Sequence, residues 1–460
     1  MAFLLTNIEH GLIGDAGGTR FTGAIRVCDG RIAEMGELSP EPGEEIVDAR
    51  GAVVTPGLVN THHHLFQSLL KGVPAAINEG LDVWLQRVPY AFWPHIDAEM
   101  LRVSARVGLA ELALSGATTV SDHHYINDED AAFDPATVLF EEAARFGVRF
   151  VLARGGGTKG RDYFDDPGMP APFREPFPLF LDRTAAIADR WHQTGARPMR
   201  QVAVAPTTPT FNVEPEHLPE IASFARDRGL RLHTHLSENR TYVDDTLRKY
   251  GKRPVAWLAD QGWLGPDVWF AHLVEVDADE IARLAETGTA MAHCPQANAR
   301  LGSGIAPADR LSAAGGVVSL GVDGAAANEA ADMGAALYAA FSLHRATKGA
   351  AATRAETVLH WATEGGARAL GLPFTGRLAP GMAADIAIFE LSSPRSFGLQ
   401  DPAVAPVVTG AAPVRHSFCA GNPVVRNGRV PWLDQETLRD EAWDATRRLV
   451  ATRAEARGRT

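Results

Sequence analysis

Three consecutive histidines follow a short apolar segment near the start of the chain. The stretch reads Thr55-Pro-Gly-Leu-Val-Asn-Thr-His-His-His64, and its Pro-Gly pair separates it from the preceding residues. Residues 58–61 are typical of a short buried strand. Because side chains alternate along a strand, we expect His62 and His64 on one face and His63 on the other. Two imidazoles on one face at a strand end supply half of a tetrahedral metal site, and a solvated histidine cluster is the alternative.

Further metal-competent side chains end other apolar segments. They are His235 in Leu232-His-Thr-His-Leu-Ser-Glu238, His272 in Phe270-Ala-His-Leu273 and Asp323 in Gly321-Val-Asp-Gly324. His233 shares a face with His235, and we expect His235 at the metal and His233 in the core. Glu238 lies three residues past His235, where it can reach a metal-bound water without being a ligand; a surface carboxylate is the alternative.

Alternating strand and helix signals predict the element that would bring these side chains together. The expected strands are residues 58–60, 118–121, 150–153, 202–205, 231–235, 268–271, 289–292 and 317–322. Eight strands alternating with helices predict a (β/α)8 TIM-type barrel with insertions, in which active sites lie where the strands end. A doubly wound open sheet is the alternative, but no G-x-G-x-x-G follows the first strand.

Short strand signals also occur at both ends of the chain. Asp29-Gly30 and Asn427-Gly428 are expected to form hairpin turns between such strands. We therefore predict a small β-sandwich domain built from residues 1–56 and 373–432, a barrel over residues 57–372, and a surface helix within the tail 433–460.

Composition narrows the possible partners and location. The 460 residues carry a net charge of −12, so the chain has no basic excess with which to bind a nucleic-acid backbone. No apolar run is long enough to span a membrane, and the N-terminus does not resemble a signal peptide. Three widely spaced cysteines imply no disulfide framework. We expect a cytoplasmic protein.

The combined motifs resemble the amidohydrolase superfamily, and within it the aminohydrolase branch that deaminates purines, pterins and related heterocycles. The resemblance covers essentially the whole chain. It rests on the histidine motif at residues 56–64, on His235-x-x-Glu238, on His272 and on Val322-Asp-Gly-Ala325, and it extends to Leu81-Asp-Val-Trp-Leu85, His293-Cys-Pro-Gln-Ala-Asn298 and Gly376-Arg-Leu-Ala-Pro-Gly-Met-Ala-Ala-Asp385.

The resemblance implies one divalent metal ion held by His62, His64, His235 and Asp323. Binuclear relatives carry a lysine at the end of the fourth strand, but here that end reads Val204-Ala-Pro-Thr-Thr208. Zn²⁺ is expected, with Fe²⁺ and Mn²⁺ as alternatives, because geometry and supply decide the metal. The resemblance also implies a homo-oligomer and a small heterocyclic substrate, such as isoxanthopterin or 8-oxoguanine.

The expected chemistry is hydrolytic deamination. A bound zinc ion lowers the pKa of its water toward about 7, and hydroxide then attacks the ring carbon that bears the amine. Glu238 is expected to move the water proton to the ring nitrogen, as general base and then acid. His272 is expected to orient the attacking oxygen, and Asp323 to help protonate the departing ammonia.

Substrate contacts are expected from Gln67 and Arg154, which can hydrogen-bond ring carbonyls, and from Trp84 and Trp93 as flat walls. The alternatives are a helix-surface glutamine, an ion-paired arginine and core tryptophans. One of His123 and His124 is expected to face inward, either at the pocket or packed in the core.

Alternative functions are loss of chloride or an alkylamine from a triazine-like ring, a guanine- or cytosine-type deaminase, and a non-catalytic scaffold.

Overall fold

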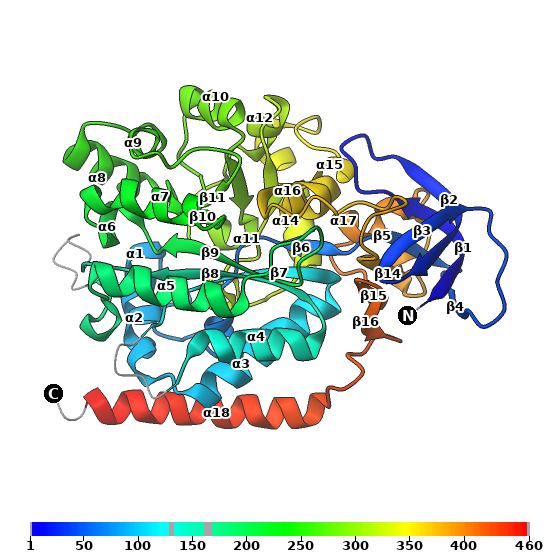
Figure 1. The fold of residues 1–460 in the computed structure, drawn as a ribbon, viewed down its shortest axis with the longest axis horizontal. Coiled ribbons are helices and arrows are strands. Elements are labelled where there is room, and N and C mark those ends of the chain that lie inside the picture. Colours follow the sequence, from blue (N-terminus) through cyan, green and yellow to red (C-terminus); the bar gives the residue numbers. More distant parts are fainter. Residues whose placement is uncertain (1, 128–132, 161–167, 458–460) are drawn as a thin grey trace.

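A ring of parallel strands forms the centre of the molecule (Figure 1). The computed structural model describes residues 2–127, 133–160 and 168–457. Eight neighbouring strands run in chain order and pair in parallel, and Thr61 N–H closes the ring by donating to Leu320 O at 3.0 Å. The strands are β6 (Leu58–Asn60), β7 (Ala117–His124), β8 (Arg149–Gly156), β9 (Arg200–Pro206), β10 (Arg231–Leu236), β11 (Val268–His272), β12 (Ala290–His293) and β13 (Val318–Leu320).

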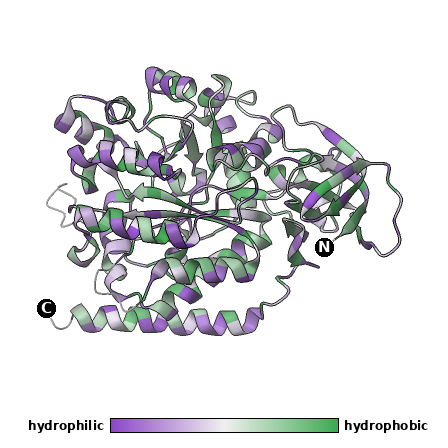
Figure 2. Cartoon of the chain, in the orientation of Figure 1, coloured by the Kyte–Doolittle hydropathy of each residue, from purple (hydrophilic) through white to green (hydrophobic). Residues whose placement is uncertain are grey.

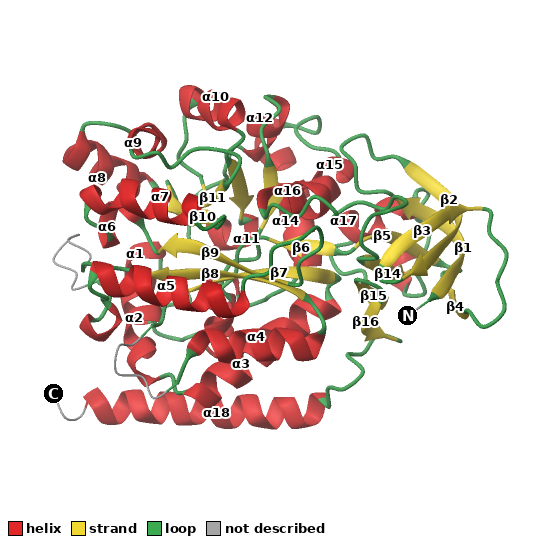
Figure 3. Ribbon diagram, in the orientation of Figure 1, coloured by secondary structure: helices red, strands yellow, loops and turns green. Residues whose placement is uncertain are grey.

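Helices surround this barrel (Figure 3). They are α1 (Leu81–Arg87), α2 (Pro89–Phe92), α3 (Ala98–Leu114), α4 (Pro135–Phe146), α5 (Phe177–Trp191), α6 (Pro209–Asn212), α7 (Leu218–Asp227), α8 (Arg240–Tyr250), α9 (Pro254–Asp260), α10 (Ala278–Thr287), α11 (Pro295–Arg300), α12 (Ala308–Ala313), α13 (Ala325–Asn328), α14 (Met333–Lys348), α15 (Ala355–His360) and α16 (Gly366–Ala369). Figure 2 shows apolar strands inside and mixed polarity on the helices, as burial of one helix face requires.

The predicted barrel is confirmed, because each expected strand overlaps a strand of the structure. Local sequence explains several helix ends. Asp277 caps α10 by accepting a hydrogen bond from Glu280 N at 2.9 Å, and the Glu280 carboxylate accepts one from the Asp277 backbone N–H at 3.1 Å. Helices α13 and α14 are separate, since Glu329 between them has a φ of +61° that a continuous helix excludes.

The two chain ends meet in a separate mixed sheet, at the right of Figure 1. Its order is β16-β15-β14-β5-β1-β2-β3, with β4 paired to β1. Strand β5 from the N-terminal part pairs antiparallel with β14 from the C-terminal part. The bounds are β1 (Phe3–Leu12), β2 (Arg20–Cys28), β3 (Arg31–Gly36), β4 (Glu45–Asp48), β5 (Ala52–Pro56), β14 (Ile386–Glu390), β15 (Val414–Cys419) and β16 (Asn422–Arg426). The cut points at residues 56, 372 and 432 stay a prediction.

The C-terminal tail forms the long helix α18 (Gln435–Arg457), and the short helix α17 (Ala405–Val408) precedes β15. Ion pairs fasten α18 to the barrel, among them Arg106 with Glu441 at 3.1 Å and Arg448 with Asp97 at 2.6 Å. The last three residues of the predicted tail lie outside the described residues. Within the described ranges, no helix combines the length and apolarity needed to cross a bilayer.

Candidate metal and active site

Four side chains from three separate barrel positions converge at the C-terminal ends of the strands. His62 and His64 follow β6, His235 lies in β10 and Asp323 follows β13. Asp323 Oδ1 lies 3.4 Å from His62 Nε2 and 3.2 Å from His64 Nε2. His235 Nε2 lies 3.3 Å from His64 Nε2. Ligand atoms of the buried residues His62, His64 and Asp323 lie within 4.8 Å of one another, close enough to share one ion, and His235 adjoins them through its contact with His64.

Hydrogen bonds at the far side of two rings decide which nitrogen faces this point. His64 Nδ1 lies 2.8 Å from His123 O, and His235 Nδ1 lies 2.6 Å from Thr207 O. A carbonyl oxygen only accepts hydrogen bonds, so each Nδ1 carries the proton and each Nε2 keeps its lone pair. His62 Nε2 is buried and has no hydrogen-bond partner among the described residues. Three imidazoles and a carboxylate oxygen are therefore a donor set that suits a borderline divalent ion.

Asp323 is charged and held in an unusual backbone conformation. Burial would raise the pKa of Asp323, but the adjacent imidazoles of His62, His64 and His272 hold that pKa well below its ordinary value. Its φ of +63° lies in the left-handed region, which is uncommon for a residue other than glycine. Asp323 N–H donates to His62 O at 3.0 Å, and His63 Nδ1 lies 2.5 Å from Asp323 O. These contacts fix the carboxylate over the histidine pair.

Glu238 and His272 stand beside this group. Glu238 Oε2 lies 3.6 Å from His272 Nε2, and both residues line the same cavity. His272 Nδ1 lies 2.9 Å from Asn298 Oδ1, which orients the imidazole ring. His272 also has a positive φ, of +73°, at the end of β11. A carboxylate and an imidazole are thus positioned to exchange a proton with a molecule in the cavity.

The cavity above these residues has mixed polar and aromatic walls. Gln67 and Trp84 line it, as does Trp93. Trp84 Nε1–H donates to Ala326 O at 3.0 Å, which fixes the plane of its indole. Gln67 Oε1 is buried without a hydrogen-bond partner in the described chain. An unpaired acceptor in a cavity wall is suited to a substrate N–H, because leaving it unpaired costs free energy.

Arg154 lies outside the cavity that Gln67 and Trp84 line. Its guanidinium is buried and donates to Glu175 Oε1 at 2.6 Å, and its Cζ lies 4.8 Å from the centre of the Phe180 ring. Arg154 is not among the described residues that line the cavity. It lines a separate hollow together with Arg183 and Trp191. The geometry matches the ion-pair alternative; a carbonyl contact by Arg154 stays an untested prediction.

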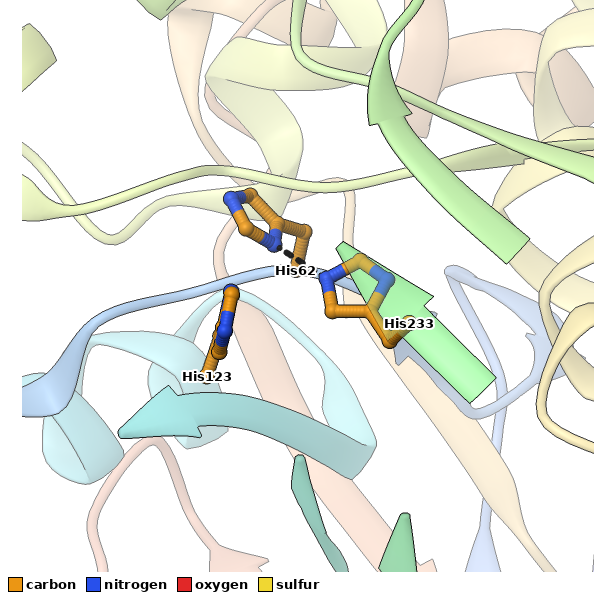
Figure 4. A group of neighbouring side chains, drawn as sticks. All are labelled: His62, His123 and His233. Carbon is orange, nitrogen blue, oxygen red and sulfur yellow. Dashed lines mark hydrogen bonds between the residues drawn. The ribbon is translucent and has the colours of Figure 1, made fainter. Parts of the chain in front are cut away.

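His123 and His124 point in opposite directions from the end of β7. His123 faces inward and stacks on His235 with ring centres 4.8 Å apart, and Figure 4 shows it beside His62 and His233. His124 packs edge-on against Phe66 with ring centres 6.0 Å apart. Neither residue is among the described ones that line the cavity. His123 therefore belongs to a layer of rings beneath the converging ligand atoms.

Several residues of the site had no individual sequence signal. Tyr125, Thr207 and Thr208 line the cavity, and Asn298 holds His272. Tyr125 directly follows His123-His124 at the end of a predicted strand, so its position could have been inferred. The role of Asn298 could not, because its contact with His272 spans 26 residues and depends on how α11 packs.

A parallel eight-stranded barrel that gathers a histidine-rich, metal-competent cluster at its strand ends defines a barrel hydrolase of the metal-dependent type. Residues 53–424 match the model of the amidohydrolase family, and the chain belongs to that family. Enzymes of this family are metal-dependent, and this protein is a hydrolytic enzyme of the amidohydrolase family.

Two characterised relatives align over nearly the whole chain. An isoxanthopterin deaminase from an unknown prokaryotic organism is 46% identical over 443 residues, covering 93% of this chain and 92% of the relative. The 8-oxoguanine deaminase of Pseudomonas aeruginosa is 40% identical over 430 residues, covering 92% of this chain and 94% of the relative. A crystal structure of atrazine chlorohydrolase from Arthrobacter aurescens TC1 complexed with zinc superposes with a TM-score of 0.90 at 28% identity. The match covers 96% of this chain and 100% of the chlorohydrolase chain.

Proposed function

We propose that this enzyme hydrolytically deaminates an oxidised pterin or purine, of the isoxanthopterin or 8-oxoguanine kind, and releases ammonia. The observation that carries the proposal is the convergence of three imidazoles and Asp323 directly beneath a cavity that also holds Glu238. The deaminase relatives, which align with almost the whole chain, support the class of substrate.

The proposed ion is a single Zn²⁺ held by His62, His64, His235 and Asp323, with Fe²⁺ and Mn²⁺ as alternatives. The free Nε2 lone pairs support this set, and the zinc in the atrazine chlorohydrolase structure supports the metal. The end of β9 carries no lysine that could bridge two ions. When bound, a divalent ion acts as a Lewis acid that makes hydroxide available near neutral pH.

The side chains around the cavity would carry the protons of the reaction. Glu238 is proposed to accept a proton from the attacking water and to deliver it to the ring nitrogen next to the reacting carbon. His272, held through Nδ1 by Asn298, is proposed to orient the attacking oxygen with Nε2. Asp323 is proposed to accept the remaining hydroxyl proton and pass it to the leaving amine. The products are a ring carbonyl and ammonia.

Substrate recognition is proposed for Gln67 and Trp84. The unpaired Oε1 of Gln67 suits an N–H of a lactam or amidine ring. The indole of Trp84, fixed by Ala326 O, supplies a flat wall for a bicyclic ring. A planar substrate with adjacent hydrogen-bond donors and acceptors fits both contacts.

An ammonia-release screen tests this proposal. The zinc-loaded enzyme is incubated separately with isoxanthopterin, 8-oxoguanine, guanine, cytosine and S-adenosylhomocysteine, and ammonia is measured by a coupled assay. We expect the highest kcat/KM for isoxanthopterin or 8-oxoguanine. Ammonia release confined to cytosine or S-adenosylhomocysteine would overturn the substrate class, and no release from any compound would overturn deamination.

Loss of chloride or an alkylamine from a triazine ring is the second candidate function. The fold shared with the atrazine chlorohydrolase favours it, because the same hydroxide attack displaces either leaving group. Atrazine and its amino derivatives are therefore added to the screen, with chloride and alkylamine measured beside ammonia.

We also propose a cytoplasmic homo-oligomer. All three cysteines, Cys28, Cys294 and Cys419, lie in the described ranges and form no disulfide, which suits a reducing compartment. Light scattering on the purified protein would test its oligomeric state.

A further inference from the structure

His62 is held differently from the other two histidines of the cluster. The Nδ1–H groups of His64 and His235 donate to backbone carbonyl oxygens, which no side-chain substitution removes. His62 Nδ1 instead lies 2.9 Å from Nε2 of another side chain, His233 (Figure 4). His233 is fully buried, and its Nδ1 lies 2.9 Å from Trp269 O. The orientation of His62 therefore depends on a replaceable residue.

The hydrogen-bond partners decide where the protons of this chain lie. Trp269 O only accepts, so His233 carries its proton on Nδ1. Burial disfavours a second proton on the ring, so His233 Nε2 is an acceptor. His62 must then donate from Nδ1, and its Nε2 keeps the lone pair that faces Asp323 and the cluster. A backbone carbonyl in β11 thus determines the tautomer of His62 through His233.

A second ion between His62, His123 and His233 is a competing explanation of this layer. Their ligand atoms lie within 4.8 Å of one another. Two of the three nitrogens, His62 Nδ1 and His233 Nε2, are already joined by one shared proton. His123 Nε2 lies 2.8 Å from Ala205 O, which leaves only His123 Nδ1 unpaired in the described chain. One free nitrogen does not make an ion site, so the layer is better explained as support for His62.

We propose that His233 is a positioning residue that sets the tautomer and ring direction of His62 and thereby the affinity of the site for its metal. The inference rests on the metal site of the proposed function. It replaces the expectation that His233 only fills the core. Residues that orient a ligand histidine in this way typically contribute about 10- to 100-fold in metal affinity.

Two variants separate positioning from packing. In His233→Leu the acceptor for His62 Nδ1–H is lost while the volume is roughly kept. In His233→Gln the side chain can place Oε1 near the former Nε2 and accept the same proton. His344→Gln is the matched control, because His344 is buried on α14 and its Nε2 lies 3.3 Å from His293, outside the cluster.

Zinc affinity is measured for each protein by chelator competition, and the cobalt(II)-loaded proteins are compared by visible absorption. We expect zinc affinity to fall about 10- to 100-fold in His233→Leu, to recover at least partly in His233→Gln and to stay unchanged in His344→Gln. The cobalt bands should shift in the Leu variant. Thermal unfolding of the metal-free proteins shows whether packing alone has suffered.

Unchanged zinc affinity in His233→Leu would overturn the proposal, as would a loss in His233→Gln equal to that in His233→Leu. If His233→Leu does not fold, comparison of His233→Gln with a His233→Met variant decides in the same way. Failure of the wild-type enzyme to bind zinc would instead overturn the proposed metal site. Failure of the ammonia screen with normal zinc binding would leave the role of His233 standing.

Discussion

Glu238 Oε2 and His272 Nε2 lie 3.6 Å apart, on side chains that extend from the ends of neighbouring barrel strands. Strands β10 and β11 pair in parallel, so their carboxyl ends present both groups at the same edge. The two residues share the cavity that lies over Asp323 and the histidine cluster. Their contact brings a proton acceptor and an orienting imidazole to the place where the proposed hydroxide attack would occur.

Replacing the carboxylate of Glu238 tests its role as the proton carrier. We expect Glu238→Gln to lower kcat by at least roughly 10²-fold, because an amide cannot accept the water proton. Zinc content should stay the same, since Glu238 is not a proposed ligand. Ammonia release and metal analysis measure the two effects. Glu220→Gln, an exposed position on α7, is the control, and near-normal turnover in Glu238→Gln would contradict the assignment.

Metal stoichiometry tests the proposed ligand set. We expect one tightly bound ion per chain in the wild-type protein, and loss of that ion with loss of activity after chelation. Asp323→Asn should weaken zinc binding, because it replaces a charged ligand whose pKa the adjacent imidazoles hold well below its ordinary value. Two tightly bound ions per chain would refute the single-ion site.

Arg154→Met separates a substrate contact from an ion pair. The buried contact between Arg154 and Glu175 at 2.6 Å predicts a loss of roughly 1.5–3 kcal/mol in the free energy of unfolding when Arg154 is removed, because Arg183 still pairs with Glu175 at 3.2 Å. We expect KM to change little, since Arg154 lies outside the cavity-lining residues of the described chain. The double variant Arg154→Met with Glu175→Leu should recover part of the stability. A large rise in KM with stability retained would restore the carbonyl contact.

Gly324 tests the position of Gln67. A Cβ on Gly324 would collide with Gln67 Oε1, so Gly324→Ala should push the amide from its place. We expect KM to rise on the order of 10-fold, as the loss of one substrate hydrogen bond predicts. Gln67→Ala should raise KM similarly, and adding Gly324→Ala to it should have little further effect. Additive effects of the two changes would show that they act independently.

Burial of His124 makes the free energy of unfolding depend on pH. Burial lowers the pKa of His124 from its ordinary 6.5 to about 4. Between these values the unfolded chain binds a proton that the folded chain does not, so stability falls as pH falls, by up to roughly 3 kcal/mol. Denaturant unfolding should show the wild type losing more stability than His124→Gln between pH 6.5 and 4.

Burial of Asp122 acts in the opposite direction, because it raises the pKa of that carboxyl to about 7. The folded chain then holds a proton that the unfolded chain releases as pH rises above 3.8, so this contribution to stability falls with rising pH. Both proteins carry Asp122, so its effect cancels in the comparison. Parallel pH profiles for the wild type and His124→Gln would contradict a buried neutral His124.

Much of the architecture followed from local patterns. Parallel strands buried on both faces are short, apolar and separated by helices, so the eight barrel strands could be found from sequence. The ends of such strands meet at one edge, which is why His62, His64, His235, His272 and Asp323 could be predicted to lie together. The pairing of β5 with β14 also agreed with strand signals at both chain ends.

Other relationships were decided only in the folded chain. The sequence placed His233 on the inward face of its strand, but its contact with His62 spans 171 residues and depends on the stagger of neighbouring strands. Arg154 lies near the C-terminal end of β8, yet its guanidinium pairs with Glu175, 21 residues later in the chain. Alternation along a strand fixes which side a residue occupies. Ring rotation, proton position and the choice among partners require the packed structure, because they depend on atoms from distant segments.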